Sequence, residues 1–277
     1  MVVSSKKNEK EIEYLDTIDF KDVIYITEDN EIYRKERLVK VIGLPVLVAP
    51  IVKIVSKELF ILINKNESRE NNCWLIDNYG NIEKSFFIDC PLELITTQKY
   101  IIASYSDSMM DIGSEFGDAQ LVVFDYQGNI VFKYNSDKNK SRIEFLEIKC
   151  FLKKDESTIL FMSYGKTKSK NDFSIVSFSL IDFSSRELFE LSDLKIKNEK
   201  LYFTAFIVKH DQWFFLCQQD RYHIVVYSLG PGDNLELYKK IRGVVIKPII
   251  GLINQGVQIK VCTDINMKKS ELISINI

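Results

Sequence analysis

The stretch Leu121–Asn129, LVVFDYQGN, joins a short apolar run to a polar turn, and a close copy occurs earlier as Trp74–Asn81, WLIDNYGN. In both copies an aspartate ends the apolar run and a glycine follows within the turn. The aspartate can accept hydrogen bonds from backbone amides further along the turn, and glycine tolerates a positive φ. Each stretch therefore predicts a tight hairpin between two antiparallel strands.

The same strand ending recurs along the whole chain. Six four-residue apolar runs end in a short polar residue, and these residues lie about 48 to 54 positions apart, within the range of a propeller blade. Elsewhere short apolar runs alternate with polar turns, and a 3.6-residue periodicity is almost absent, so we predict an all-β protein. The closing residues are Thr27, Asp77, Asp125, Ser179, Ser228 and Asn276.

Each repeat reads as four strands, which we call a to d from first to last, with the tight turn between c and d. Four-stranded antiparallel units repeated radially form a β-propeller, and the chain resembles β-propeller proteins over nearly its whole length. It lacks the Gly-His and Trp-Asp signature of WD40 repeats and the paired glycines of kelch repeats. The resemblance therefore identifies an architecture and no specific family; a pair of β-sandwiches is the competing fold.

The strand count predicts five blades, with six as the alternative. We identify five a–b pairs and five d strands but six c strands, so the two chain ends each supply part of one blade. We expect residues 1–277 to form a single domain whose closing blade is shared by the N- and C-terminal strands, which leaves no open edge. Residues 1–20 are expected to be partly disordered or to supply the closing strand.

Composition excludes several classes of function. The 277 residues carry a net charge of -2, so no overall charge steers the chain to nucleic acid or an anionic membrane. The longest apolar run, Val41–Val55, contains two prolines and a lysine and is shorter than the roughly 20 residues that span a bilayer. The N-terminus has no secretory signal pattern. We expect no membrane and no nucleic-acid partner.

The five cysteines are odd in number, far apart and without zinc-like spacing. They predict reduced thiols in a cytoplasmic protein without a metal or cofactor. Cys217 and Cys262 fall in the repeat column that holds Ser104 and Ser163, at the end of strand b. A column of small side chains indicates a packing position, whereas a catalytic cysteine needs a setting that stabilises its thiolate.

The connections between strands b and c vary most in length, and variable loops on a rigid scaffold commonly carry function. The resemblance to propellers implies that they emerge on the face that commonly binds ligands. The longest, Ser106–Ala119, is acidic with apolar residues among its acids, and Gly165–Asp172 is basic. We predict a partner-binding surface made of Asp107, Met109, Met110, Asp111, Glu115, Phe116, Asp118, Lys166, Lys168, Lys170, Asp220 and Arg221.

Two other interpretations of these loops stay open. Both loops can be solvated segments with weak mutual attraction, and the apolar residues of Ser106–Ala119 either fold back over the blade or form an exposed contact. The acids at 107, 111, 115 and 118 are interrupted by two methionines, unlike the alternating ligands of a calcium loop.

Enzyme chemistry has little support, and we predict no catalytic residue. The expected a strands offer only Glu93, Glu144 and Glu147 as acids, and His210 and His223 are the only histidines. No nucleophile-elbow, phosphate-loop or dinucleotide motif occurs. A carbohydrate-active hydrolase with channel carboxylates is the alternative from another class, and a general interaction scaffold is a third.

The segment Ser104–Asp125, a variable loop that runs into the LVVFDYQGN hairpin, is similar to small bacterial propeller-like proteins that serve as toxin-neutralising immunity factors. The abundance of Lys, Asn and Ile is typical of an AT-rich bacterial genome. The resemblance implies a non-enzymatic protein that binds another protein, such as a toxin, and occludes its active site with the b-to-c loop face.

Overall fold

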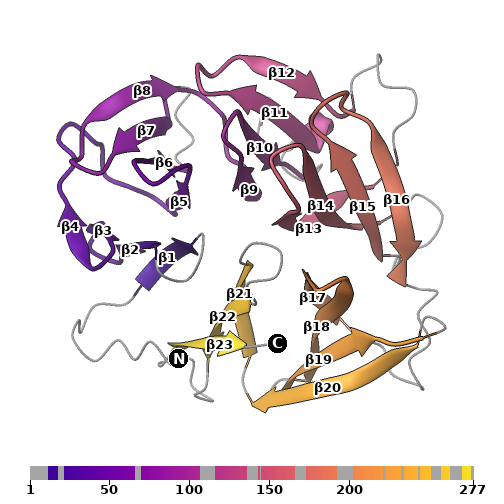
Figure 1. Ribbon diagram of the computed structural model, residues 1–277. Helices are drawn as coiled ribbons and strands as arrows, with labels where there is room; N and C mark the ends of the chain where they lie inside the picture. Colours follow the sequence, from indigo (N-terminus) through magenta and orange to yellow (C-terminus); the bar gives the residue numbers. More distant parts are fainter. Residues whose placement is uncertain are drawn as a thin grey trace. The chain divides into compact units, whose positions relative to one another are not determined.

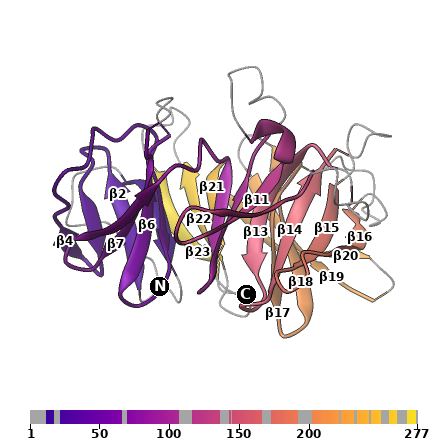
Figure 2. The ribbon, with the colours of Figure 1, turned by 90° about the horizontal axis from the view of Figure 1, so that it is seen from above.

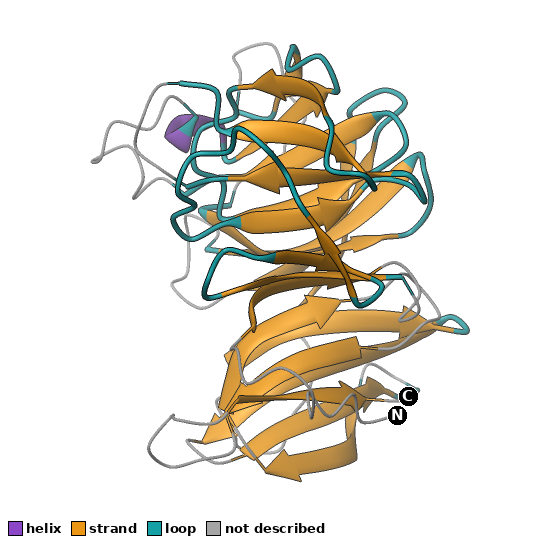
Figure 3. Ribbon diagram, turned by 90° about the vertical axis from the view of Figure 1, so that its left-hand side faces the viewer, coloured by secondary structure: helices purple, strands orange, loops and turns teal. Residues whose placement is uncertain are grey.

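The computed structural model describes residues 12–17, 22–65, 70–106, 116–135, 143, 145–165, 173–191, 202–220, 223–231, 234–242, 244–250, 257–262 and 270–275. Almost all of this part of the chain is strand or connecting loop, with a short 3₁₀ helix at Gly117–Ala119 (Figure 3). The predicted all-β class is therefore confirmed.

The chain packs as two compact units, which are described separately. One comprises Lys6–Arg142 with Leu146–Ile148, and the other comprises Met1–Ser5, Ile143–Phe145 and Lys149–Ile277. We call them the first and the second unit, after the order of their strands along the chain (Figure 1). That residues 1–277 act as one domain stays a prediction.

The first unit contains three four-stranded antiparallel sheets, each built from consecutive strands. The first strands of neighbouring sheets are in contact: β1 packs against β5, and β5 packs against β9. The sheets are β1(Ile12–Thr17), β2(Val23–Thr27), β3(Ile32–Arg34) and β4(Arg37–Val39); β5(Ile51–Ile54), β6(Leu59–Ile63), β7(Cys73–Asp77) and β8(Ile82–Phe86); β9(Glu93–Thr96), β10(Tyr100–Ser104), β11(Leu121–Asp125) and β12(Ile130–Lys133).

The second unit contains two four-stranded sheets and one three-stranded sheet. Seen from above, β13, β14 and β15 run side by side in one sheet (Figure 2). The sheets are β13(Glu147–Lys153), β14(Thr158–Tyr164), β15(Phe173–Ser179) and β16(Ser185–Glu190); β17(Tyr202–Lys209), β18(Gln212–Asp220), β19(His223–Leu229) and β20(Leu235–Arg242); β21(Val244–Ile250), β22(Val257–Cys262) and β23(Ser270–Ile275).

Five four-stranded antiparallel blades are present, as predicted, but the predicted closing blade shared by both chain ends is wrong for the described residues. Strands β1–β4 form one sheet and β21–β23 a separate one. Strand β1 pairs with β2, and the chain that leaves β3 turns back at Lys35 and Glu36, whose φ angles are 50° and 63°, to form β4. Residues 12–39 thus form a sheet of their own, whereas residues 1–11, part of the expected closing strand, lie outside the described part of the chain.

The two aspartate turns have the predicted geometry. Asp77 Oδ1 accepts hydrogen bonds from the backbone amides of Tyr79 and Asn81 at 2.8 and 2.9 Å, and Gly80 has a φ of 89°. The turn at Asp125 repeats these contacts, with donor amides at 2.8 and 2.9 Å. Desolvation acts to raise the pKa of each aspartate, but the hydrogen bonds outweigh it and hold the pKa below its ordinary value.

Acid is expected to destabilise the protein through these turns. Because the pKa of Asp77 and Asp125 is lower in the folded chain than the ordinary 3.8, their contribution to the free energy of unfolding is complete above that pH. It is lost as the pH falls through the folded-state pKa. The measurement is the urea midpoint between pH 7 and pH 2. The double variant Asp77→Asn, Asp125→Asn should give a flatter profile than Glu83→Gln, an exposed carboxylate on β8; equal profiles would contradict this role.

The repeat column at the end of strand b is buried. Ser104 and Cys217 have no exposed surface and Ser163 is 3 % exposed. Burial raises the pKa of the Cys217 thiol well above its ordinary value, which disfavours the thiolate. Cys217 is thus a packing residue, as predicted, while the side chain of Cys262 lies outside the described part of the chain.

A buried arginine, paired with an aspartate of its own sheet, joins the first two sheets of the first unit. Arg34 on β3 donates to both oxygens of Asp22 at 3.0 Å through Nε and Nη2. The same guanidinium donates to Asn78 Oδ1 at 2.7 Å and to the Ser56 carbonyl at 2.6 Å, both on turns of the second sheet. Only 4 % of the Arg34 surface is exposed. The arginine therefore anchors the β3–β4 hairpin against the neighbouring sheet.

Candidate protein-binding site

Most of the predicted partner-binding residues lie outside the described part of the chain. They are Asp107, Met109, Met110, Asp111, Glu115, Lys166, Lys168, Lys170 and Arg221. Asp220 ends β18, where its backbone pairs with His223, but its side chain is also outside the described part. Asp118 is exposed, as expected for a surface contact. That these residues bind a partner stays a prediction.

The prediction that Phe116 lies on the partner-binding surface is wrong, because its side chain is buried in the core. It is 4 % exposed, and its ring lies 5.5 Å from that of Tyr105 and 5.6 Å from that of Phe124, between centroids. Lys133 Nζ lies 4.9 Å from the ring centroid. Burying the aromatic ring lowers the free energy of the folded chain because it removes apolar surface from water, so this end of the loop folds back over the blade.

An exposed apolar surface occurs instead at the crossover from β4 to β5, residues 40–50. The exposed fraction is 89 % for Ile42, 78 % for Val46 and 51 % for Val48, and 43 % for Leu38 on the adjoining β4. An exposed apolar surface in this run was not predicted from the sequence. The feature of the sequence that could have indicated this surface is an apolar stretch interrupted by Pro45 and Pro50, since proline favours a connection over a strand.

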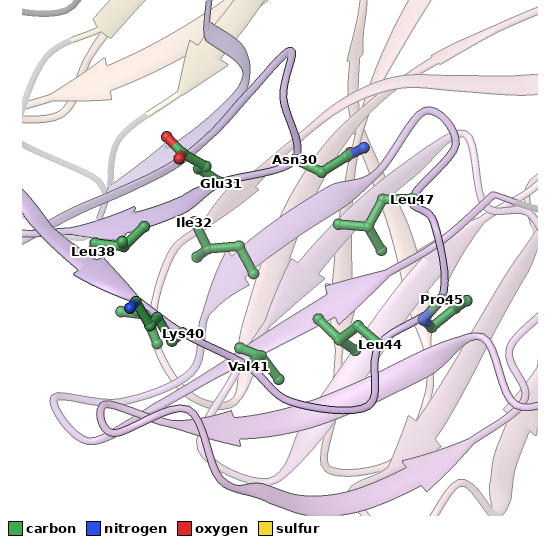
Figure 4. Close-up of a pocket in the computed structure, with 10 residues that line it drawn as sticks. Asn30, Glu31, Ile32, Leu38, Lys40, Val41, Leu44, Pro45 and Leu47 are labelled. Carbon is green, nitrogen blue, oxygen red and sulfur yellow. The ribbon is translucent and has the colours of Figure 1, made fainter.

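A groove of about 390 Å³ lies between the β3–β4 hairpin and the crossover. Its walls are mainly aliphatic and include Ile32, Leu38, Leu44 and Leu47, with Leu38 on the hairpin side and Leu44 on the crossover side (Figure 4). Three polar residues, Asn30, Glu31 and Lys40, complete the lining. A mostly apolar concavity with a few polar groups is the usual anatomy of a binding site.

The crossover is held in place by the buried side chain of Asn64, which is 1 % exposed. Asn64 Oδ1 accepts from the Val48 amide at 2.6 Å, and its Nδ2 donates to the Val46 carbonyl at 3.0 Å. The Lys65 amide donates to the Val48 carbonyl at 3.1 Å. These bonds fix the backbone so that Val46 and Val48 face outward while Leu47 faces the core, which gives a connection the alternation of a strand.

The start of the crossover packs against the aspartate turn of the second sheet. A Cβ placed on Gly80 would lie 2.0 Å from the Lys40 carbonyl oxygen, so only glycine allows this close approach. Gly43 also has a positive φ of 88°, but nothing lies within 4 Å of its Cβ position. The aspartate turn at Asp77–Asn81 thus also positions one wall of the groove.

The polar groups of the groove differ in how they are satisfied. Glu31 Oε2 accepts a hydrogen bond from the Tyr33 hydroxyl at 2.9 Å. Lys40 is exposed and forms no ion pair within the part of the chain that the structure describes. Asn30 has a φ of 62°, and its Oδ1 is buried without a hydrogen-bond donor among the described groups. The groove therefore carries one cation, Lys40, one anion, Glu31, and a buried amide oxygen, that of Asn30.

A charged cluster on the inner strands of the first unit bears on the hydrolase alternative. Lys53 Nζ on β5 lies 2.9 Å from Asp16 Oδ1 on β1, and the Ile54 amide donates to Asp16 Oδ2 at 2.8 Å. Burial acts to lower the pKa of Lys53, but the charge of Asp16, with smaller contributions from Tyr14 and Glu93, outweighs it and raises the pKa. Both oxygens of Asp16 thus tie two strands together. Asp16 was not predicted as an acid of the inner strands, because its strand β1 was not assigned from the sequence.

Of the other acids expected from the sequence, Glu93 on β9 lies in the same unit, and its charge contributes to the raised pKa of Lys53. Glu147 begins β13, and Glu144 is outside the described part. His210 lies in the exposed β17–β18 turn with a φ of 49°, and His223 begins β19.

The sequence matches no protein-family model and no curated protein. Among solved structures, it is similar to the β-propeller domain of Cps50 (Swd1) from Myceliophteria thermophila, with 8 % identity and a TM-score of 0.54 over 100 % of this chain and 99 % of that one. It is also similar to the tricorn protease, with 12 % identity and a TM-score of 0.49 over 94 % of this chain. For an oligogalacturonate lyase in complex with manganese, the identity is 8 % and the TM-score 0.45 over 87 % of this chain.

The chain spans 29 % of the tricorn protease chain and 64 % of the lyase chain. Within the described residues, no helix has the length and apolar character that crossing a bilayer would require. The repeated antiparallel blades and the likeness to the Cps50 domain along its full length establish the fold, and this chain is a β-propeller.

Proposed function

We propose that the protein is a non-enzymatic binding protein whose partner is another protein and whose contact surface includes the groove and the crossover. The propeller fold supports a protein-binding scaffold in general. The observation that carries the proposal is a set of exposed aliphatic side chains: Leu38, which lines the groove, and Ile42, Val46 and Val48 on the crossover, whose neighbours in the chain line it. Apolar side chains that gather around a concavity and are rimmed by polar residues are typical of an interface.

The finer role, that of a cytoplasmic immunity-type inhibitor that occludes a toxin, rests on the sequence resemblance and the uneven loops. The thiols of Cys73, Cys150 and Cys217 are buried and form no disulfide among the described residues, which suits a reducing compartment and supports the cytoplasmic part of this proposal. The hydrolase alternative is less well supported, because Asp16, the acid that the structure adds to the inner strands, is already neutralised by Lys53.

Charge placed on the crossover is expected to abolish partner binding. Ile42→Asp and Val46→Asp should each reduce recovery of a cross-linked partner about ten-fold or more, because a buried aliphatic contact contributes roughly 1.5 to 3 kcal/mol. Since both side chains are already exposed, the fold should persist, which circular dichroism would verify. The matched control is Ile181→Asp, because Ile181 is 80 % exposed on a turn of the second unit. Equal recovery with all three variants would contradict the siting.

A further inference from the structure

The groove has a polar rim that a purely apolar partner would leave unsatisfied, and this deepens the proposed function, on which the inference rests. The Lys40 ammonium stands beside Leu38 with no ion pair in the described chain, while Glu31, on the other side of Leu38, already accepts the Tyr33 hydroxyl (Figure 4). The hydroxyl is neutral and does not cancel the charge of Glu31, so the rim carries one negative and one positive group on opposite sides of Leu38. A partner that places a carboxylate beside Lys40 would form a partly desolvated ion pair.

The buried amide oxygen adds a second requirement. Asn30 is one of the residues that line the groove, and its Oδ1 is buried without a donor among the described groups. A buried acceptor without a donor costs free energy, so an occupant that brings an N–H group is favoured once the Asn30 amide turns toward it. A peptide backbone supplies such groups, whereas lipid acyl chains supply none. The groove therefore suits a peptide better than a bilayer.

We propose that the groove binds an extended peptide segment of the partner protein that inserts a large aliphatic side chain between Leu38 and Leu44 and sets an acidic residue beside Lys40. The volume of about 390 Å³ lies at the low end of small-ligand sites, which suits one or two side chains of a peptide. The fixed backbone of the crossover, held by Asn64, offers this site preformed, and a preformed site avoids the entropic cost of ordering it upon binding.

Fluorescence polarisation with short labelled peptides tests this proposal. The probes are fluorescein-Ser-Glu-Leu-Leu-Glu-Ser-amide, the same peptide with both Glu changed to Lys, and the acidic peptide with both Leu changed to Ser. We expect the acidic leucine peptide to bind about three- to five-fold more tightly than the basic one, the size of one partly exposed ion pair. The serine peptide should bind about ten-fold or more weakly.

Charge reversal makes the test specific. Lys40→Glu should reverse the order of the acidic and basic peptides, whereas Lys57→Glu, the same change at an exposed position of the first unit outside the groove, should leave it unchanged. No peptide binding, the same order in Lys40→Glu as in the wild type, or tight binding to phosphatidylserine vesicles instead of peptides would each overturn the inference. The proposed function has a different test from the peptide inference: it is contradicted if Ile42→Asp and Val46→Asp leave recovery of the partner unchanged.

Discussion

Replacing Arg34 with methionine is expected to lower the free energy of unfolding by about 3 to 5 kcal/mol, because the change takes both guanidinium hydrogen bonds from the Asp22 carboxylate, of which only 9 % of the side chain is exposed. The substitution also removes the donors to Asn78 and to the Ser56 carbonyl, which join the first two sheets. Methionine keeps much of the apolar contact of the arginine stem, so the loss reports the charge and its hydrogen bonds. Urea denaturation followed by circular dichroism measures it.

The matched control is Lys35→Met. Lys35 Nζ lies 3.2 Å from the same Asp22 oxygen, but its side chain is 54 % exposed. Removing this exposed partner should cost no more than about 1 kcal/mol. The double variant Asp22→Asn, Arg34→Met should recover part of the loss, because it also removes the buried carboxylate that has lost its guanidinium partner. Equal effects of Arg34→Met and Lys35→Met would show that burial does not distinguish the two pairs.

Gly80→Ala is expected to lower the free energy of unfolding by about 3 kcal/mol or more. An alanine at a positive φ costs roughly 1 to 2 kcal/mol, and the added Cβ would lie 2.0 Å from the Lys40 carbonyl oxygen, which forces the backbone to shift. Because that shift moves Lys40, peptide affinity should fall with stability. Thermal and urea denaturation measure the first effect and fluorescence polarisation the second.

Gly43→Ala separates the two causes. Gly43 has nearly the same φ, 88°, but no atom lies within 4 Å of its Cβ position. The loss should therefore be that of the backbone conformation alone, about 1 to 2 kcal/mol. If the two alanine variants were equally destabilised, the close approach of the turn to the crossover would not contribute, and the wall of the groove would depend on other contacts.

The hairpins were predictable because their causes are local. In Trp74–Asn81 the aspartate, glycine and asparagine that form the turn lie within five residues of one another, and the hydrogen bonds join those same residues. The buried column of Ser104, Ser163 and Cys217 was predictable for a related reason. Each blade presents the same position to the same packing environment, so the repeat reveals the burial.

The first sheet could not be assigned from pattern alone. Strand β1 has the short sequence IEYLDT, whose pairing with β2 depends on partners at a distance, such as Asp16 with Lys53 and the Ile54 amide on β5. The turn at Lys35 and Glu36 carries no glycine, although both residues adopt positive φ. Local preferences gave no warning of either feature, and tertiary contacts overrode them.

The all-β class, the four-stranded repeat and the aspartate turns follow from the sequence alone, because each depends on residues close together in the chain. The burial of Phe116 and the exposure of Ile42 and Val46 depend on tertiary packing, since all three are apolar side chains in connections. Burial of a loop residue depends on which strand passes beneath it and on anchors such as Asn64, which lies 16 residues from the amide it binds. Hydrophobicity is a property of the residue, whereas exposure is a property of its neighbours.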